Sequence, residues 1–96
     1  MFPHVTSVTP LKDYQLAIAF DDGESGILDF KKFIGGEFKG VLSDLAKPEV
    51  FRKVFVAPEA RTVAWSDQLE FDPINLYAHA TGKFEILKPY GIEQNG

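Results

Sequence analysis

The sequence contains no cysteine, so neither disulfide bonds nor thiolate metal sites are available to it. It has two histidines, His4 and His79, and neither belongs to a catalytic or metal-binding motif. Such a role requires both rings to lie close together beside a third group. Because His4 begins a predicted strand and His79 ends a predicted helix, we expect no catalytic residue, no metal ligand and no cofactor. The sequence favours a non-enzymatic protein.

Basic side chains are also scarce. The net charge is −4, and Arg52 and Arg61 are the only arginines. Proteins that hold nucleic acid by its phosphates need clustered lysines and arginines. The only basic pairs here are Lys31-Lys32 and Arg52-Lys53, and a solvated surface explains both. We therefore expect no direct binding to nucleic acid.

Long hydrophobic runs are missing too. No apolar run approaches the roughly 20 residues of a membrane helix, and Met1–His4 does not begin a signal peptide. We expect no membrane association and a cytoplasmic location. The 96 residues are enough for one domain. We expect it to span residues 1–87, followed by a flexible tail over residues 88–96.

Large apolar side chains are present in quantity, since 45% of the residues are hydrophobic and nine are Phe. They supply enough area for one core. The stretch Thr62–Ala80 is the most informative, and it holds the only Trp. Val63 and Trp65 alternate with small residues and predict a strand. Ser66-Asp67-Gln68 then predicts a turn, and we expect Trp65 to be largely buried.

A short helix is predicted directly after this strand. Asp72 is a favourable N-cap, Pro73 suits the first helical position, and Gly82 is a typical left-handed stop. The helix presents one apolar stripe, made by Ile74, Tyr77 and Ala78. A helix this short is unstable alone. We expect it to pack on the sheet that contains Trp65.

The clearest strand alternates without exception, with four large apolar residues on one face: Tyr14, Leu16, Ile18 and Phe20. The following Asp21-Asp22-Gly23 fits a three-residue hairpin loop ending in a left-handed Gly. That loop pairs Phe20 with Glu24 and Leu16 with Leu28, and it places Phe30 opposite Tyr14. A two-residue Asp22-Gly23 turn is the alternative, but it places Asp29 in the apolar row, so we prefer the longer loop.

The remaining segments complete the predicted order. They comprise a first strand over His4–Leu11, an irregular loop over Lys31–Gly40, helical turns at Val41–Leu45 and Pro48–Lys53, a strand at Val54–Val56 and weak strand character at Phe84–Leu87. Three strands, short helical turns, three strands and a helix therefore follow one another. This order predicts an α+β fold, with a mostly antiparallel sheet of about five strands and one short C-terminal helix packed on it.

One further pattern supports a family resemblance. Its most specific part is the ending Thr62-Val63-x-Trp65 followed by Phe71-Asp72-Pro73-x-x-Leu76-Tyr77. Single positions upstream extend it, namely Val8, Pro10, Tyr14, Leu16, Phe20, Gly23, Asp29, Gly36, Phe38, Leu42, Phe51 and Val54. Over roughly residues 4 to 80, the chain resembles a family of small bacterial proteins catalogued as domain of unknown function 2442.

The resemblance implies an α+β fold and a bacterial cytoplasmic protein. It implies no activity. Some relatives carry an added helix-turn-helix domain, and others resemble partners in gene pairs of the toxin–antitoxin kind. These likenesses assign no role to any residue.

Two groups of side chains are candidates for a site. The acidic group Asp21, Asp22 and Glu24 has the oxygen chemistry of a cation site, but a hairpin turn explains the same residues. The aromatic residues Phe33 and Phe38 lie on a glycine-containing loop, where a large ring is harder to bury.

We therefore expect an interaction module that binds a protein partner, or a second copy as a homodimer, through a sheet edge or the Phe33–Phe38 loop. The alternative is a small-ligand-binding or hydrolytic domain that uses Asp67, Glu70 or Asp72 near Trp65. The candidate binding residues are Phe33, Phe38, Trp65 and Asp67.

Overall fold

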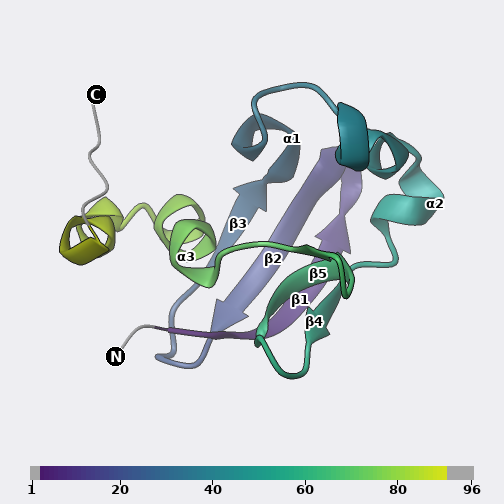
Figure 1. Cartoon of the computed structure of the whole chain (residues 1–96). Coiled ribbons are helices and arrows are strands. Elements are labelled where there is room, and N and C mark those ends of the chain that lie inside the picture. The colour runs from purple at the N-terminus through teal and green to yellow at the C-terminus, as the bar shows by residue number, and fades with distance from the viewer. Residues whose placement is uncertain (1–2, 91–96) are drawn as a thin grey trace.

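The computed structural model describes residues 3–90 of the 96-residue chain (Figure 1). Its strands are β1 (Val5–Leu11), β2 (Gln15–Phe20), β3 (Ser25–Asp29), β4 (Phe55–Ala57), β5 (Thr62–Ser66) and β6 (Leu69–Glu70). Its helices are η1 (Lys12–Tyr14), α1 (Phe30–Phe33), η2 (Gly40–Ala46), α2 (Pro48–Phe51), α3 (Pro73–Thr81) and η3 (Phe84–Tyr90), where η marks a 3₁₀ helix. The α+β prediction is confirmed. The strands form two antiparallel sheets of three, with orders β1-β2-β3 and β4-β5-β6, rather than one sheet of about five.

The β2–β3 hairpin has the predicted three-residue loop. The Phe20 amide donates to the Glu24 carbonyl at 2.9 Å, and Leu16 pairs with Leu28. Gly23 has a φ of 90°, the left-handed conformation that closes this loop. The predicted pairing of Phe30 with Tyr14 was wrong, because Phe30 begins α1 instead of extending β3.

The turn into α1 depends on the side chain of Asp29. Its carboxylate accepts a hydrogen bond from the Lys32 amide at 3.1 Å and so caps the first turn. The predicted loop over Lys31–Gly40 therefore begins with helical residues. The predicted helical turns further on are confirmed as η2 and α2, and α1 and α2 lie at the upper end of the sheet in Figure 1.

The core lies against one face of the β1-β2-β3 sheet. Leu16, Ile18 and Phe20 alternate along β2 with the half-buried Ala17 and Ala19. The three large side chains are at most 3% exposed. They belong to a cluster that also contains Leu28, Phe30, Leu45, Phe51, Val63, Leu76 and Tyr77. The opposite face of the sheet therefore lies outside this core.

The second sheet is attached to β1. The Val5 amide donates to the Arg61 carbonyl at 2.9 Å, and β1 lies against β4 and β5. Trp65 points from β5 towards the core, packs against it, and keeps part of its ring exposed. Its indole N–H donates to the Phe51 carbonyl at 3.0 Å. This bond satisfies the polar end of the ring at the border of the core.

The caps of α3 are as predicted. The Asp72 carboxylate accepts from the Ile74 amide at 3.0 Å, Pro73 occupies the first helical position, and Gly82 ends the helix with a φ of 80°. The predicted docking of α3 on the sheet of Trp65 was wrong, because α3 packs against β3 (Figure 1). A Cβ atom on Gly26 of β3 would lie 2.0 Å from the Ala80 carbonyl oxygen. Only glycine allows this approach.

The segment after α3 also differs from its prediction. Phe84–Leu87 was expected to have weak strand character, but it lies within η3. Phe84 and Leu87 are three residues apart, which places them on one side of a 3₁₀ helix. Leu87 is fully buried against Ile74 and Ala78 of α3. Packing on a helix, rather than pairing with a strand, therefore determines this conformation. Residues 91–96 of the expected tail lie outside the described residues.

Within residues 3–90, no helix combines the length and hydrophobicity that crossing a bilayer requires.

Candidate functional site

The acidic β2–β3 turn is held by partners from three other parts of the chain. The Asp21 carboxylate accepts from the His4 amide at 3.0 Å, and the Asp22 carboxylate accepts from the Tyr77 hydroxyl at 2.7 Å. Glu24 forms an ion pair with Lys83 at 2.9 Å. These contacts direct the three carboxylates towards different neighbours. Hence the turn has a structural explanation.

Two pKa shifts accompany the contacts of Asp21 and Asp22. The backbone hydrogen bond from His4 holds the pKa of Asp21 below its ordinary value. The hydrogen bond to Asp22 raises the pKa of Tyr77 to about 12, because it stabilises the protonated phenol. Both shifts follow from contacts within the fold. Among residues 3–90, no three His, Cys, Asp or Glu side chains are grouped so that they could hold a metal ion.

Two of the predicted binding residues lie in one aromatic cluster. Phe33 and Trp65 each contact both Phe30 and Phe71, with ring centroids 4.9 to 6.3 Å apart. Phe30 lies at the centre of the cluster and is fully buried. The cluster joins α1 to the second sheet, so its first role is to build the core.

The other two predicted residues lie elsewhere. Phe38 is half-buried and packs on Tyr14, whose hydroxyl donates to the Ala46 carbonyl. Asp67 is exposed in the turn after β5. No hydrogen bond or ring contact within residues 3–90 joins Phe38 or Asp67 to Phe33 or Trp65. The four residues therefore do not form one site.

The large hydrophobic side chains that remain exposed are different ones. Among the described residues they are Ile27 of β3 at 61% exposure, Val41 of η2 at 85% and Phe55 of β4 at 41%. Val41 stands on the 3₁₀ helix η2. The ring of Phe55 borders a hollow of about 230 Å³ that Glu59, Asp67 and Glu70 also line. Ile27 and Phe55 both belong to a sheet, and Ile27 is the more exposed of the two.

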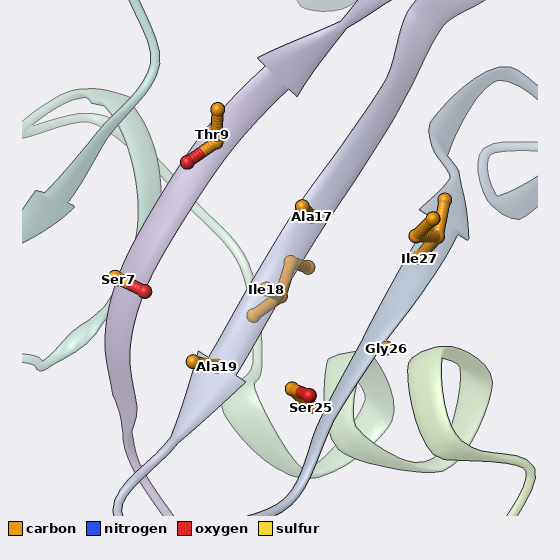
Figure 2. Close-up of a pocket in the computed structure, with 8 residues that line it drawn as sticks. All are labelled: Ser7, Thr9, Ala17, Ile18, Ala19, Ser25, Gly26 and Ile27. Atoms are coloured by element: carbon orange, nitrogen blue, oxygen red, sulfur yellow. The ribbon is translucent and has the colours of Figure 1, made fainter.

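The face of the β1-β2-β3 sheet opposite the core, which no described element covers, carries mainly small or uncharged side chains. Cross-strand rows place Thr9 beside Ala17 and Ile27, and Ser7 beside Ala19 and Ser25. Figure 2 shows these six side chains on three neighbouring strands around a shallow hollow of about 220 Å³. None of them is ionisable. These six residues therefore supply no general base, and none of them can activate the hydroxyls of Ser7, Thr9 and Ser25 as nucleophiles.

The outer edge of β3 is the second notable feature of this sheet. Within the described part of the chain, β3 pairs only with β2. Since Phe20 and Glu24 form a hydrogen-bonded pair, alternation along an antiparallel ladder turns the backbone groups of Ser25, Ile27 and Asp29 outward. An edge strand with outward N–H and C=O groups is a template for pairing with another chain.

A hollow of about 340 Å³ adjoins this edge. Leu28, Asp29, Lys32, Phe33 and His79 line it, so α1 and α3 form its walls beside β3. The His79 ring lies edge-on to Phe33 and to Phe84, with both centroid distances 5.0 Å, and its Nδ1 is 2.9 Å from the Asn75 carbonyl. Phe33, predicted as a binding residue, thus borders the outer edge of β3.

Comparison with known families agrees with the pattern of residues described above. The model of the family described as proteins of unknown function, DUF2442, matches residues 5–82. The chain belongs to the DUF2442 family. No curated protein matches it.

A solved structure is similar to this DUF2442 chain over most of its length. It is that of NE0471, a candidate DNA-binding protein from Nitrosomonas europaea, with 25% sequence identity and a TM-score of 0.74. The match covers 97% of this chain but only 64% of NE0471. More than a third of NE0471 therefore has no counterpart in the match.

The edge of β3 was not recognisable as a site from the DUF2442 sequence alone. Ser25–Asp29 reads as an ordinary hairpin strand, and nothing local shows whether a further strand covers it. Gly26 was the one available signal, because glycine within a strand often marks the close approach of another backbone. Here that backbone belongs to α3 at Ala80.

Proposed function

We propose that this DUF2442 domain is a non-enzymatic protein-interaction module that takes an extended segment of a partner along the outer edge of β3. The observation that supports it best is the outward backbone of Ser25 and Ile27 beside the hollow at His79. A strand added there would continue the sheet through main-chain hydrogen bonds.

The other sheet edges are less suitable for this purpose. β1 lies against β4 and β5, contains Pro10, and has a register shift between Val5 and Ser7. Prolines and bulges protect an edge from further pairing. β4 has three residues and β6 has two, so neither offers a long ladder. β3 has five residues and neither a proline nor a register shift in its pairing.

Selectivity for the partner segment would come from the side chains on either side of the β3 edge. Alternate side chains of an added strand point to opposite faces of the sheet. One set would lie beside Ile27 on the uncharged face. The other would point to the hollow that Phe33, His79 and Lys32 line. A partner encoded beside this protein, as in toxin–antitoxin-like pairs, is one source of such a segment.

The experiment is amide hydrogen exchange on the native protein, purified with whatever protein remains bound to it, compared with the free protein. The amides of Ser25 and Ile27 should become protected in the complex. Those of Gly26 and Leu28, which already face β2, should change little and serve as internal controls. A purified complex that leaves Ser25 and Ile27 exchanging as in the free protein would contradict the proposed site.

DNA binding is a second candidate function to test, because the similar structure NE0471 is described as a candidate DNA-binding protein. Residues 31–53 hold six basic and three acidic side chains, although the whole chain has a net charge of −4. Such an excess is small for a phosphate-binding surface. We propose that the domain does not itself bind DNA. Fluorescence anisotropy with duplex DNA at low salt tests this, and tight binding that weakens steeply with added salt would overturn it.

A further inference from the structure

We propose that the strand accepted at the outer edge of β3 is β3 of a second copy, running antiparallel, so that two sheets join into one of six strands. This inference rests on the proposed function, since it uses the same edge, and it names the occupant. Three observations on β3 support it. Every second residue turns its backbone N–H and C=O groups outward, Ile27 is exposed, and the two ends of the strand have opposite charges.

The register follows from the backbone. Outward groups belong to the odd-numbered residues of β3, and hydrogen bonds across the new edge require odd residues to face odd residues. A two-fold axis at Ile27 satisfies this condition and pairs the whole of Ser25–Asp29. Ile27 then faces Ile27 of the second copy, and Ser25 faces Asp29 of the second copy. An axis at any other residue leaves one end of the strand unpaired.

Ile27, at the centre of this register, is a large hydrophobic side chain that the single copy leaves exposed. Ile27 is 61% exposed, although it lies within a sheet. Figure 2 shows it on β3, the strand at one edge of the three-stranded sheet, at the border of the uncharged face. In the paired form the two Ile27 side chains lie side by side, and cross-strand pairs of β-branched residues stabilise a sheet.

Charge at the strand ends favours the antiparallel direction. Asp21, Asp22 and Glu24 precede β3, whereas Lys31 and Lys32 follow it. Antiparallel pairing about Ile27 brings the acidic end of each copy towards the basic end of the other. Opposite charges across such an interface fix its direction and register.

The size of the interface sets the expected strength. A single edge of five residues is smaller than the interfaces of permanent dimers, which bury upwards of roughly 2,000 Å². We therefore expect a dimer that dissociates on dilution. Its dissociation constant should lie between about 1 μM and about 1 mM.

Sedimentation equilibrium of the full chain over that range of concentration is the first measurement. The mass should rise from 10.7 kDa towards twice that value. Ile27→Lys and Ile27→Glu should each remain monomeric, because like charges then face each other at the centre of the edge. An equimolar mixture of these two variants should dimerise again, because opposite charges now face each other. Val41→Lys is the matched control, since Val41 is also exposed but lies on η2, and it should dimerise like the unaltered protein.

The outcomes separate this inference from the proposed function. An unaltered protein that stays monomeric at about 1 mM overturns the inference. So does a mixture of the Lys and Glu variants that stays monomeric although each is folded by circular dichroism. If Ser25 and Ile27 are nevertheless protected in a complex with a different protein, the proposed function stands without the homodimer. If they are protected in neither case, both fail.

Discussion

The hydroxyl of Tyr77 on α3 donates to the carboxylate of Asp22 in the β2–β3 turn at 2.7 Å. Tyr77 is 6% exposed, and its ring packs edge-on against Phe20 at 4.9 Å. The pair thus fastens the only α-helix of more than four residues within the described chain to the tip of the central hairpin. Residues 55 positions apart in sequence are joined by one short bond.

Tyr77→Phe should remove this bond while keeping the ring. We expect the free energy of unfolding to fall by about 1.5–3 kcal/mol, because a hydrogen bond to a charged group is lost. Chemical denaturation at neutral pH measures it. Tyr14→Phe is a control for losing a phenol, because its hydroxyl bonds to the Ala46 carbonyl elsewhere. If Tyr77→Phe leaves the free energy of unfolding unchanged, the ring alone fixes α3 and the hydroxyl contributes nothing.

The same bond predicts a dependence on alkaline pH. The pKa of Tyr77 is raised to about 12 in the folded protein, above the ordinary value of 10.0. Its contribution to stability is therefore complete below pH 10.0 and is lost as the pH rises towards 12. Denaturation at a series of alkaline pH values should show this loss, and Tyr77→Phe should lack the part that this phenol causes.

Lowering the pH should weaken the contact between Asp21 and His4, on the other side of the turn. The His4 amide and side chain hold the pKa of Asp21 below its ordinary value of 3.8. The stabilising contribution of Asp21 is therefore present above 3.8 and disappears as the pH falls through the lowered pKa. NMR titration of the Asp21 carboxyl should give a midpoint below 3.8. A midpoint at or above that value would show that the contact with His4 does not persist in solution.

The N-cap of α3 can be tested by Asp72→Ala. Two bonds are lost, one from the Ile74 amide and one from the Asn75 side chain. We expect a cost of about 1 kcal/mol, or a fall in Tm of about 4–8 °C for a domain of this size. Asp67→Ala is the matched control, since Asp67 is exposed in a turn, and it should be nearly neutral. Equal effects from the two substitutions would remove the cap as the explanation.

Gly26→Ala tests the docking of α3 on β3. The added Cβ would lie 2.0 Å from the Ala80 carbonyl oxygen, which belongs to backbone and cannot rotate away. We expect a loss of about 1–3 kcal/mol, as for other overpacked sites. Ser25→Ala on the same strand should cost little, because Ser25 is exposed. A neutral Gly26→Ala would mean that α3 moves freely over the sheet.

Local chemistry explains which parts of the fold were predictable. The Asp21-Asp22-Gly23 loop and the Asp72-Pro73 helix start depend on neighbouring residues alone, and both are confirmed. The docking of α3 and the conformation of Phe84–Leu87 depend on residues far apart in sequence. Alternation and capping contain no information about such contacts, which explains why those two predictions failed.

The candidate site shows the same division. The sequence predicted a sheet edge or an aromatic loop as the binding surface, but it could not say which edge. That answer requires the strand order, because β3 is an edge only if no strand lies beyond it. Phe33 was a reasonable candidate for its size, yet its place beside β3 arises from the Asp29 cap that starts α1. The binding roles of Phe33, Phe38, Trp65 and Asp67 remain predictions.

The three bonds of the acidic turn have a mechanical consequence. His4 near the start of the chain, and Tyr77 and Lys83 near its end, are all tied to one hairpin. A force that draws the two ends of the chain apart would therefore load these three contacts at the turn first. In an optical trap, the first rupture should release this tip, while the aromatic interior is still intact.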